Sequence, residues 1–265
     1  MLDNHYIAMQ PEYEEQLRWV GLEPGWHVLD AGCGSGSFLP LLTELVGSDG
    51  AVSAIDLAAE SIRTVQKRAE QSGWPAPVSA RVGPVHDLPY EDDCFDAVWC
   101  ANTTMYLTDD QLRAALAEFR RVTRPGGLIA IKAYDGTTEQ FQPSTPTLFI
   151  HAMEKRCRYG SQVDCGLLRV IELPKWLREA GLVDMRQKAT LIVRFQPLDP
   201  ATEQLMAGFL QGIHQQNQQL GVELPEKEAR LWQKLADTDS PDHILHHPDF
   251  QYRVIESVFV ARVPD

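Results

Sequence analysis

Short apolar runs along the chain alternate with stretches in which apolar residues recur at helical spacing. Between the apolar runs, Leu112, Leu116 and Phe119 show this helical spacing in one of the stretches. The pattern predicts strands at residues 27–31, 52–56, 78–82, 97–101 and 128–133, and helices at 37–46, 59–73 and 109–123. A βαβ series of this kind forms a mostly parallel sheet with right-handed crossovers and helices on both faces.

The regular pattern breaks after Tyr134. A stretch rich in Pro, Thr and Gly follows, and the expected elements then resume as a helix at 174–181 and strands at 190–195 and 257–263. We therefore divide the chain into a core of residues 1–136, 173–196 and 253–265 and two insertions, 137–172 and 197–252. Ligands of open α/β sheets bind beyond the carboxyl ends of the strands, so both insertions are expected to form a substrate cap over that crevice.

Composition narrows the possible partners. A net charge of −13 repels phosphate backbones and argues against nucleic acid. No apolar stretch of about 18 residues occurs, so we expect no membrane contact. Five cysteines without CxxC spacing predict reduced thiols and a cytoplasmic location. The oligomeric state cannot be predicted from these features.

The strongest local signal is the run from Val28 to Phe38, a buried strand followed by a glycine loop and a helix. Gly32, Gly34 and Gly36 alternate within it, and glycine allows positive φ and close approach of a ligand. A dinucleotide fingerprint requires a third glycine where Ser37 stands, and this difference disfavours a nicotinamide or flavin cofactor.

Asp56 ends the second expected strand. A carboxylate at this place can accept hydrogen bonds from two ribose hydroxyls, each contributing about 1.5–3 kcal/mol. The alternative is that Asp56 caps the helix that begins near Ala59.

With these motifs, residues 24 to 134 resemble the class I S-adenosylmethionine-dependent methyltransferases. The resemblance also covers residues 95–107, which match the family's fourth strand and the segment after it, and residues 121–127, which match the turn before its fifth strand. It implies a Rossmann-like, doubly wound, seven-stranded sheet with an antiparallel last strand, and S-adenosyl-L-methionine as cofactor. The residues it assigns to the cofactor are Asp30, Ala31, Gly32, Gly34, Gly36, Asp56, Leu57, Val85, His86, Asn102, Tyr6 and Gln10.

One position departs from the family pattern. Pro84 stands where relatives often carry an acid that binds the adenine amino group. The resemblance therefore leaves the adenine contact to Val85 or His86, and His86 can equally be an ordinary loop residue.

The acceptor side is less defined. Tyr106 stands where small-molecule relatives often carry His or Tyr, although it could instead pack on the next helix. Lys132 ends the fifth strand and is more often a solvated or paired charge. Substrate-pocket candidates are Tyr13, Tyr106, Tyr134, His151 and Phe209, and unranked candidates for a general base are His86, Asp135, Glu139, His151, His214 and Glu172. Catalytic residues cannot be assigned from the sequence.

Two further motifs suggest other chemistry. His243, His246 and His247, flanked by Asp242 and Asp249, could bind zinc or iron, but we favour an exposed helix end and expect no metal. Cys157 and Cys165 could suggest thiol chemistry. We expect instead that both are buried small residues.

The resemblance implies transfer of a methyl group from S-adenosylmethionine to an O, C or N atom of a small, partly apolar molecule. The acidic charge and the apolar residues of the insertions favour such an acceptor over a protein. The alternatives are a noncatalytic S-adenosylmethionine-binding module and a nucleotide-dependent oxidoreductase.

Overall fold

The computed structural model describes residues 2–145, 147–161, 165–241 and 243–265. The chain divides into two compact units, which we describe separately. The sheet unit comprises Tyr13–Ala133, Ile171–Ala189 and Ser257–Asp265, and the helical unit comprises Met1–Glu12, Tyr134–Val170 and Thr190–Glu256. The division into core and substrate cap made from the sequence remains a prediction.

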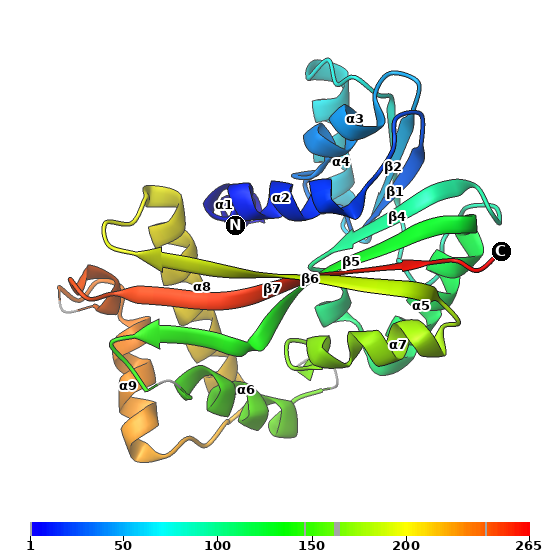
Figure 1. Cartoon of the computed structure of the whole chain (residues 1–265). Coiled ribbons are helices and arrows are strands. Elements are labelled where there is room, and N and C mark those ends of the chain that lie inside the picture. The colour runs from blue at the N-terminus through cyan, green and yellow to red at the C-terminus, as the bar shows by residue number, and fades with distance from the viewer. Residues whose placement is uncertain (1, 146, 162–164, 242) are drawn as a thin grey trace. The chain divides into compact units, whose positions relative to one another are not determined.

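The sheet has seven strands in the order β3-β2-β1-β4-β5-β7-β6, and β7 is antiparallel (Figure 1). In its parallel part, Asp30 lies opposite Ala54 on one side and Trp99 on the other. The predicted doubly wound fold is thereby confirmed. The strands are β1 (His27–Ala31), β2 (Ala51–Asp56), β3 (Val78–Val82), β4 (Phe95–Ala101), β5 (Thr123–Gln142), β6 (Val183–Phe195) and β7 (Gln251–Arg262).

The last three strands are longer than their sequence pattern suggests. The predicted break after Tyr134 is wrong, because β5 continues to Gln142. Its second half is held by β7, where the Ile255 amide donates to Thr138 Oγ1 at 2.9 Å. Pairing between strands distant in sequence thus overrides a local composition that favours a loop.

Helices cover both faces of the sheet unit. They are α2 (Gln10–Val20), α3 (Leu39–Val46), α4 (Ala59–Gln71), α5 (Asp109–Val122) and α7 (Leu173–Glu179), together with a 3₁₀ turn, η1 (Thr104–Tyr106). One buried cluster joins Leu17 of α2, Leu42 of α3 and Val65 of α4 to Trp99 of the sheet. The helices α5 and α7 lie on the opposite face (Figure 1). A capping box of Thr108 and Gln111 fixes the start of α5. It thereby also fixes where the segment that connects β4 to α5 ends.

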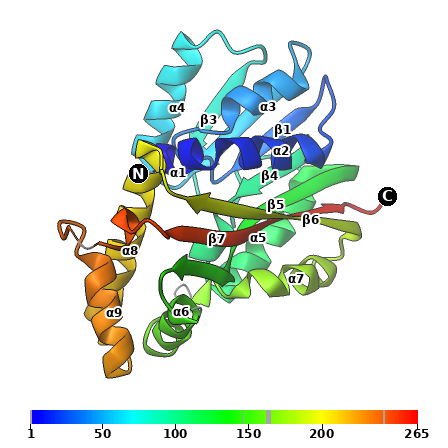
Figure 2. The ribbon, with the colours of Figure 1, turned by 60° about the vertical axis from the view of Figure 1, so that its left-hand side comes forward.

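The helical unit contains the helices α1 (Leu2–Ala8), α6 (Leu148–Tyr159), α8 (Pro200–Gln219) and α9 (Glu226–Ala236). It also contains the 3₁₀ turn η4 (Ile244–His246), and a second 3₁₀ turn, η3 (Arg169–Glu172), crosses the boundary between the units in the sequence. The helix α9 comes after α8 in the chain and lies beside it (Figure 2). The Arg194 guanidinium on β6 makes two 2.8 Å bonds to the Glu12 carboxylate and a third to the Ala8 carbonyl. Such a bidentate pair anchors the N-terminal residues on β6.

Two of the five cysteines form a disulfide, Cys157–Cys165, with Cα atoms 4.7 Å apart. The expectation of reduced thiols is wrong for this pair, as is its interpretation as two buried small residues. Cys157 lies in the last turn of α6, which ends at Tyr159, and Cys165 returns to it eight residues later in the sequence. Sequence spacing alone does not reveal such a return. Cys33, Cys94 and Cys100 carry free thiols.

Breaking this disulfide is expected to lower the free energy of unfolding by about 2.5 kcal/mol, because a closed loop of this size restricts the unfolded chain. Urea unfolding of the Cys157→Ser/Cys165→Ser double variant measures the effect, with Cys94→Ser as the control. Equal stability of wild type and double variant under non-reducing conditions would contradict the assignment.

Candidate functional site

The glycine loop after β1 is closed tightly against its neighbours. Gly32 and Gly36 have φ of +80° and +81°, which disfavour any side chain. A Cβ on Gly32 would lie 2.2 Å from Thr103 Oγ1. The Gly32 and Cys33 amides donate to the Ile55 carbonyl at 2.8 and 3.0 Å, so β2 fixes the first turn of the loop.

Asp56 holds the middle of the same loop. Its Oδ2 accepts from the Gly34 amide at 2.8 Å, and its Oδ1 accepts from the Ala58 amide at 2.9 Å. Asp56 is not the N-cap residue of α4, which is Ala58, so the helix-cap alternative holds only through the hydrogen bond that Asp56 Oδ1 accepts from the Ala58 amide. A carboxylate oxygen can accept a second hydrogen bond, so ribose binding by Asp56 remains possible and stays a prediction.

Asp30 lies beneath the loop with only 1% of its surface exposed. Its Oδ2 has no hydrogen-bond partner among the described residues. Burial and, as the smaller cause, the charge of Asp56 together raise the pKa of the Asp30 carboxyl to about 8. A buried acid with an unmet acceptor fits a ligand that brings a cation or a hydrogen-bond donor to this point.

Lys132, in the middle of β5, is joined to Asn102, the residue directly after β4. The Asn102 amide donates to the Lys132 carbonyl at 2.9 Å, and Lys132 Nζ donates to Asn102 Oδ1 at 3.0 Å. Asn102 has a φ of +53°. The Nζ of Lys132 lies 3.6 Å from the centre of the Tyr13 ring. The solvated alternative for Lys132 is wrong, since the side chain is fully buried. Tyr13 in turn stacks on Phe38 at 5.9 Å.

The side of the loop expected to receive adenine carries an exposed apolar residue and an unpartnered ring atom. Leu57 is 74% exposed, whereas Val85 is buried. The buried Nδ1 of His86 makes no hydrogen bond within the described part of the chain. Both features fit a flat heterocycle, although the assignment of Leu57, Val85 and His86 to adenine remains a prediction.

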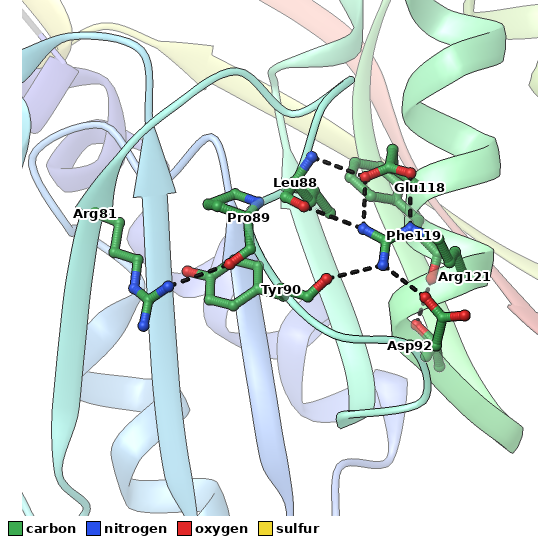
Figure 3. Close-up of polar contacts among 9 residues, drawn as sticks. Arg81, Leu88, Pro89, Tyr90, Asp92, Glu118, Phe119 and Arg121 are labelled. Atoms are coloured by element: carbon green, nitrogen blue, oxygen red, sulfur yellow. Dashed lines mark hydrogen bonds and ion pairs between the residues drawn. The ribbon is translucent and has the colours of Figure 1, made fainter.

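Arg121 clamps the next segment, residues 88–92, onto α5 (Figure 3). Its guanidinium donates to both carboxylate oxygens of Glu118 at 2.8 Å and to the carbonyls of Leu88 and Tyr90 at 3.1 and 2.8 Å. A further bond of 2.8 Å reaches Asp92 Oδ1. Glu118 Oε2 also accepts from the Leu88 amide, and its partners lower the Glu118 pKa. The clamp fixes the segment that follows His86.

The remaining candidates are distributed over both units. Tyr106 is 65% exposed in η1, so it is not buried against α5 as the packing alternative requires. Tyr6 lies in α1, and Gln10 is the first residue of α2. In the helical unit the Tyr134 and Phe209 rings are 6.3 Å apart, and His151 Nδ1 lies 3.1 Å from Glu228. The structure thus brings the glycine loop, Asp30, Asp56, Asn102 and Tyr13 together in the sheet unit, and Tyr134 with Phe209 in the helical unit.

The histidine group is dispersed among separate partners. His243 is buried, with Nε2 2.8 Å from the Leu235 carbonyl, so its interpretation as part of an exposed helix end is wrong. His246 faces Glu203 at 3.6 Å and His247 faces Asp249 at 3.9 Å. Asp242 lies outside the described residues. No set of three potential metal ligands converges in the part of the chain that the structure describes.

Two residues that support the loop could not be recognised from the sequence. Thr103 Oγ1 donates to the Gly32 carbonyl at 3.3 Å, and Arg68 donates to the Ser35 carbonyl at 2.8 Å. The position of Thr103 directly after the motif residue Asn102 is the only sequence signal among them. Among the residues that the structure describes, no helix combines the length and apolar character that a membrane span requires.

Comparison with known proteins agrees with this geometry. Residues 28–127 match the family of methyltransferase domains. Over 119 residues the chain is 38% identical to a 2-phytyl-1,4-naphthoquinone methyltransferase of Trichormus variabilis, covering 44% of this chain and 51% of the relative. It is 30% identical over 118 residues to a demethylmenaquinone methyltransferase of Symbiobacterium thermophilum, covering 43% and 45%. The chain therefore spans about half the length of these relatives.

Solved structures share the fold over almost the whole chain. The YcgJ protein of Bacillus subtilis superposes with a TM-score of 0.60 at 14% identity, covering 96% of this chain and 99% of that one. Phosphoethanolamine N-methyltransferase 2 of Haemonchus contortus, solved with S-adenosylhomocysteine, gives 0.56 at 15% identity and covers 95% and 52%. Residues 28–127 of this chain are therefore a methyltransferase domain by sequence, and the fold is the one seen in these solved structures.

Proposed function

We propose that this protein transfers a methyl group from S-adenosylmethionine to an O, C or N atom of a small, partly apolar molecule. The observation that carries the proposal is the buried, unpartnered Oδ2 of Asp30 beneath a glycine loop that Asp56 holds in place. A ligand bearing an ammonium group and a ribose would meet both carboxylates. Neither feature is needed by a scaffold that binds nothing.

In this proposal, different residues of the sheet unit bind different parts of the cofactor. Asp30 receives the α-ammonium group, Asp56 the ribose hydroxyls, and Leu57 with His86 the adenine. Asn102, held by Lys132, positions the amino-acid end. S-adenosylmethionine supplies a methyl group on a sulfonium, which leaves a neutral thioether after transfer. Tyr6 and Gln10 are proposed as further cofactor contacts.

The contribution of the protein is then mainly alignment and exclusion of water. Holding the reacting groups at near-attack distance can contribute about 7–11 kcal/mol to lowering the barrier. The quinone-methylating relatives support an acceptor that is small and partly apolar. We also propose that residues 137–172 and 197–252 select this acceptor. The disulfide removes the support for a cytoplasmic location, so the proposal names no compartment.

Methyl transfer is tested by incubating the protein with S-adenosylmethionine and a panel of reduced naphthoquinones, phenols and amines. The expected result is one equivalent of S-adenosylhomocysteine for each acceptor that gains a methyl group. Binding of the cofactor without turnover of any panel member above the level of Asp56→Ala would favour the noncatalytic module.

The raised pKa of Asp30 predicts how binding of S-adenosylhomocysteine depends on pH. Below about pH 8 the free protein holds a proton on Asp30 that an ammonium ligand must displace. Affinity should therefore rise with pH, by up to about tenfold per unit below the pKa, and level off above it. Calorimetry in two buffers of different ionisation enthalpy measures the released proton, and Asp30→Asn should bind weakly without this dependence. A flat wild-type profile contradicts the role given to Asp30.

A further inference from the structure

The helical unit contains a buried polar group that the proposed function does not use. Tyr134 and Glu139 on β5 and Tyr252 and Glu256 on β7 lie in it, each at most 6% exposed. We call these four residues the Tyr–Glu cluster. Around them stand three phenylalanine rings, which we call the aromatic wall, namely Phe141, Phe149 and Phe209.

Strand geometry explains why Tyr252, Glu256 and Glu139 meet, whereas Tyr134 is an odd number of residues from Glu139 and is not placed by this alternation. Tyr252 and Glu256 alternate with the exposed Arg253 along β7, so both point to one face of the sheet. Glu139 and Phe141 are likewise two residues apart on β5 and both buried. The centres of the Phe141 and Tyr252 rings lie 5.0 Å apart, so the side chains of the two strands meet on the same face of the sheet.

Three polar atoms of the Tyr–Glu cluster lack partners. Neither carboxyl oxygen of Glu139 completes a hydrogen bond with a described residue, and neither does the Tyr134 hydroxyl. Burial raises the pKa of Glu139 well above its usual range, although the nearby Tyr134 and Tyr252 phenols act in the opposite direction. Native proteins rarely leave such buried groups unsatisfied without a ligand or water to bind there.

The aromatic wall supplies a place for a flat ring beside these atoms. Phe209 of α8 is only partly buried and lies 5.7 Å from Phe149, 6.4 Å from Phe141 and 6.3 Å from Tyr134. It therefore lies beside every other ring of the wall and is the one member that is not fully buried. Aromatic rings at these separations are within the range in which ring stacking is favourable.

We infer that this group is a binding subsite for a flat aromatic molecule that carries a hydroxyl. The ring stacks within the aromatic wall, the hydroxyl donates to Glu139, and the Tyr134 hydroxyl donates to the oxygen of the ligand. An aromatic molecule without the hydroxyl would leave all three protein atoms unpaired and bind more weakly. That the bound molecule is the methyl acceptor rests on the proposed function, whereas binding itself does not.

Calorimetric titration of the full chain with 1-naphthol and 1-methoxynaphthalene tests the subsite, because the two probes differ in the ability to donate a hydrogen bond. The wild type should bind 1-naphthol at least tenfold more tightly. Glu139→Leu should abolish this preference, because Glu139 accepts the donated hydroxyl. Tyr134→Phe should weaken the binding of both probes, because each carries an oxygen that can accept from the Tyr134 hydroxyl. The matched control is Glu154→Leu on the exposed side of α6, which should retain the preference.

Equal affinity of the wild type for both probes, binding of neither, an unchanged preference in Glu139→Leu, or unchanged affinities in Tyr134→Phe would overturn the inference. If Glu139→Leu does not fold, judged by circular dichroism, the wild-type comparison and Tyr134→Phe still decide. Titration with S-adenosylhomocysteine runs in parallel. Loss of cofactor binding with the naphthol preference intact contradicts the proposed function alone, and the reverse contradicts the subsite alone.

Discussion

Replacing Arg121 by alanine is expected to lower the free energy of unfolding by about 2–4 kcal/mol. The guanidinium holds Glu118 by two bonds and the carbonyls of Leu88 and Tyr90 by one each, and it also pairs with Asp92 (Figure 3). Its removal leaves the Glu118 carboxylate, which is 20% exposed, without its cationic partner. It also releases the segment that connects His86 to β4.

Urea unfolding measures this loss. Arg121→Lys retains the charge but not the fork of donors, so its effect should be intermediate. Arg63→Ala, on the exposed side of α4, is the control and should change stability by less than about 0.5 kcal/mol. Similar values for Arg121→Ala and Arg63→Ala would show that the clamp is not what holds residues 88–92.

Replacing Asp56 by alanine is the second large change, and we expect it to weaken S-adenosylhomocysteine binding by more than tenfold. The substitution removes the acceptor for the ribose and frees the Gly34 and Ala58 amides that shape the loop. The protein should remain folded, because Asp56 is only partly buried at the end of β2. Titration calorimetry gives the affinity, with Glu60→Ala on the first turn of α4 as control. Unchanged affinity in Asp56→Ala would contradict the assignment of Asp56 to the ribose.

Much of the fold could be predicted because it is encoded locally. The strand at His27–Ala31 and the helix beginning at Asp109 lie where the apolar pattern places them. The lengths of β5, β6 and β7 could not be predicted, since their outer halves are stabilised by pairing between distant segments. Nor could the Cys157–Cys165 disulfide, which depends on the turn after α6.

The candidate site shows the same division. The glycine loop and Asp56 are adjacent motifs whose spacing reflects the ligand that they are expected to bind. The buried state of Lys132 and the contact of Thr103 with Gly32 arise only when β1, β4 and β5 are placed side by side. Glu139 was one of several unranked acids in the sequence, and only its burial beside Tyr134 and Tyr252 distinguishes it. Residues that act through tertiary contacts carry no local signature.

Parallel calorimetric titration of the purified protein with S-adenosylhomocysteine and with NADH tests the central claim most directly, because it requires no knowledge of the acceptor. The account predicts binding of S-adenosylhomocysteine with a Kd of about micromolar order and no binding of NADH. Binding of NADH alone, or of neither compound, would contradict it.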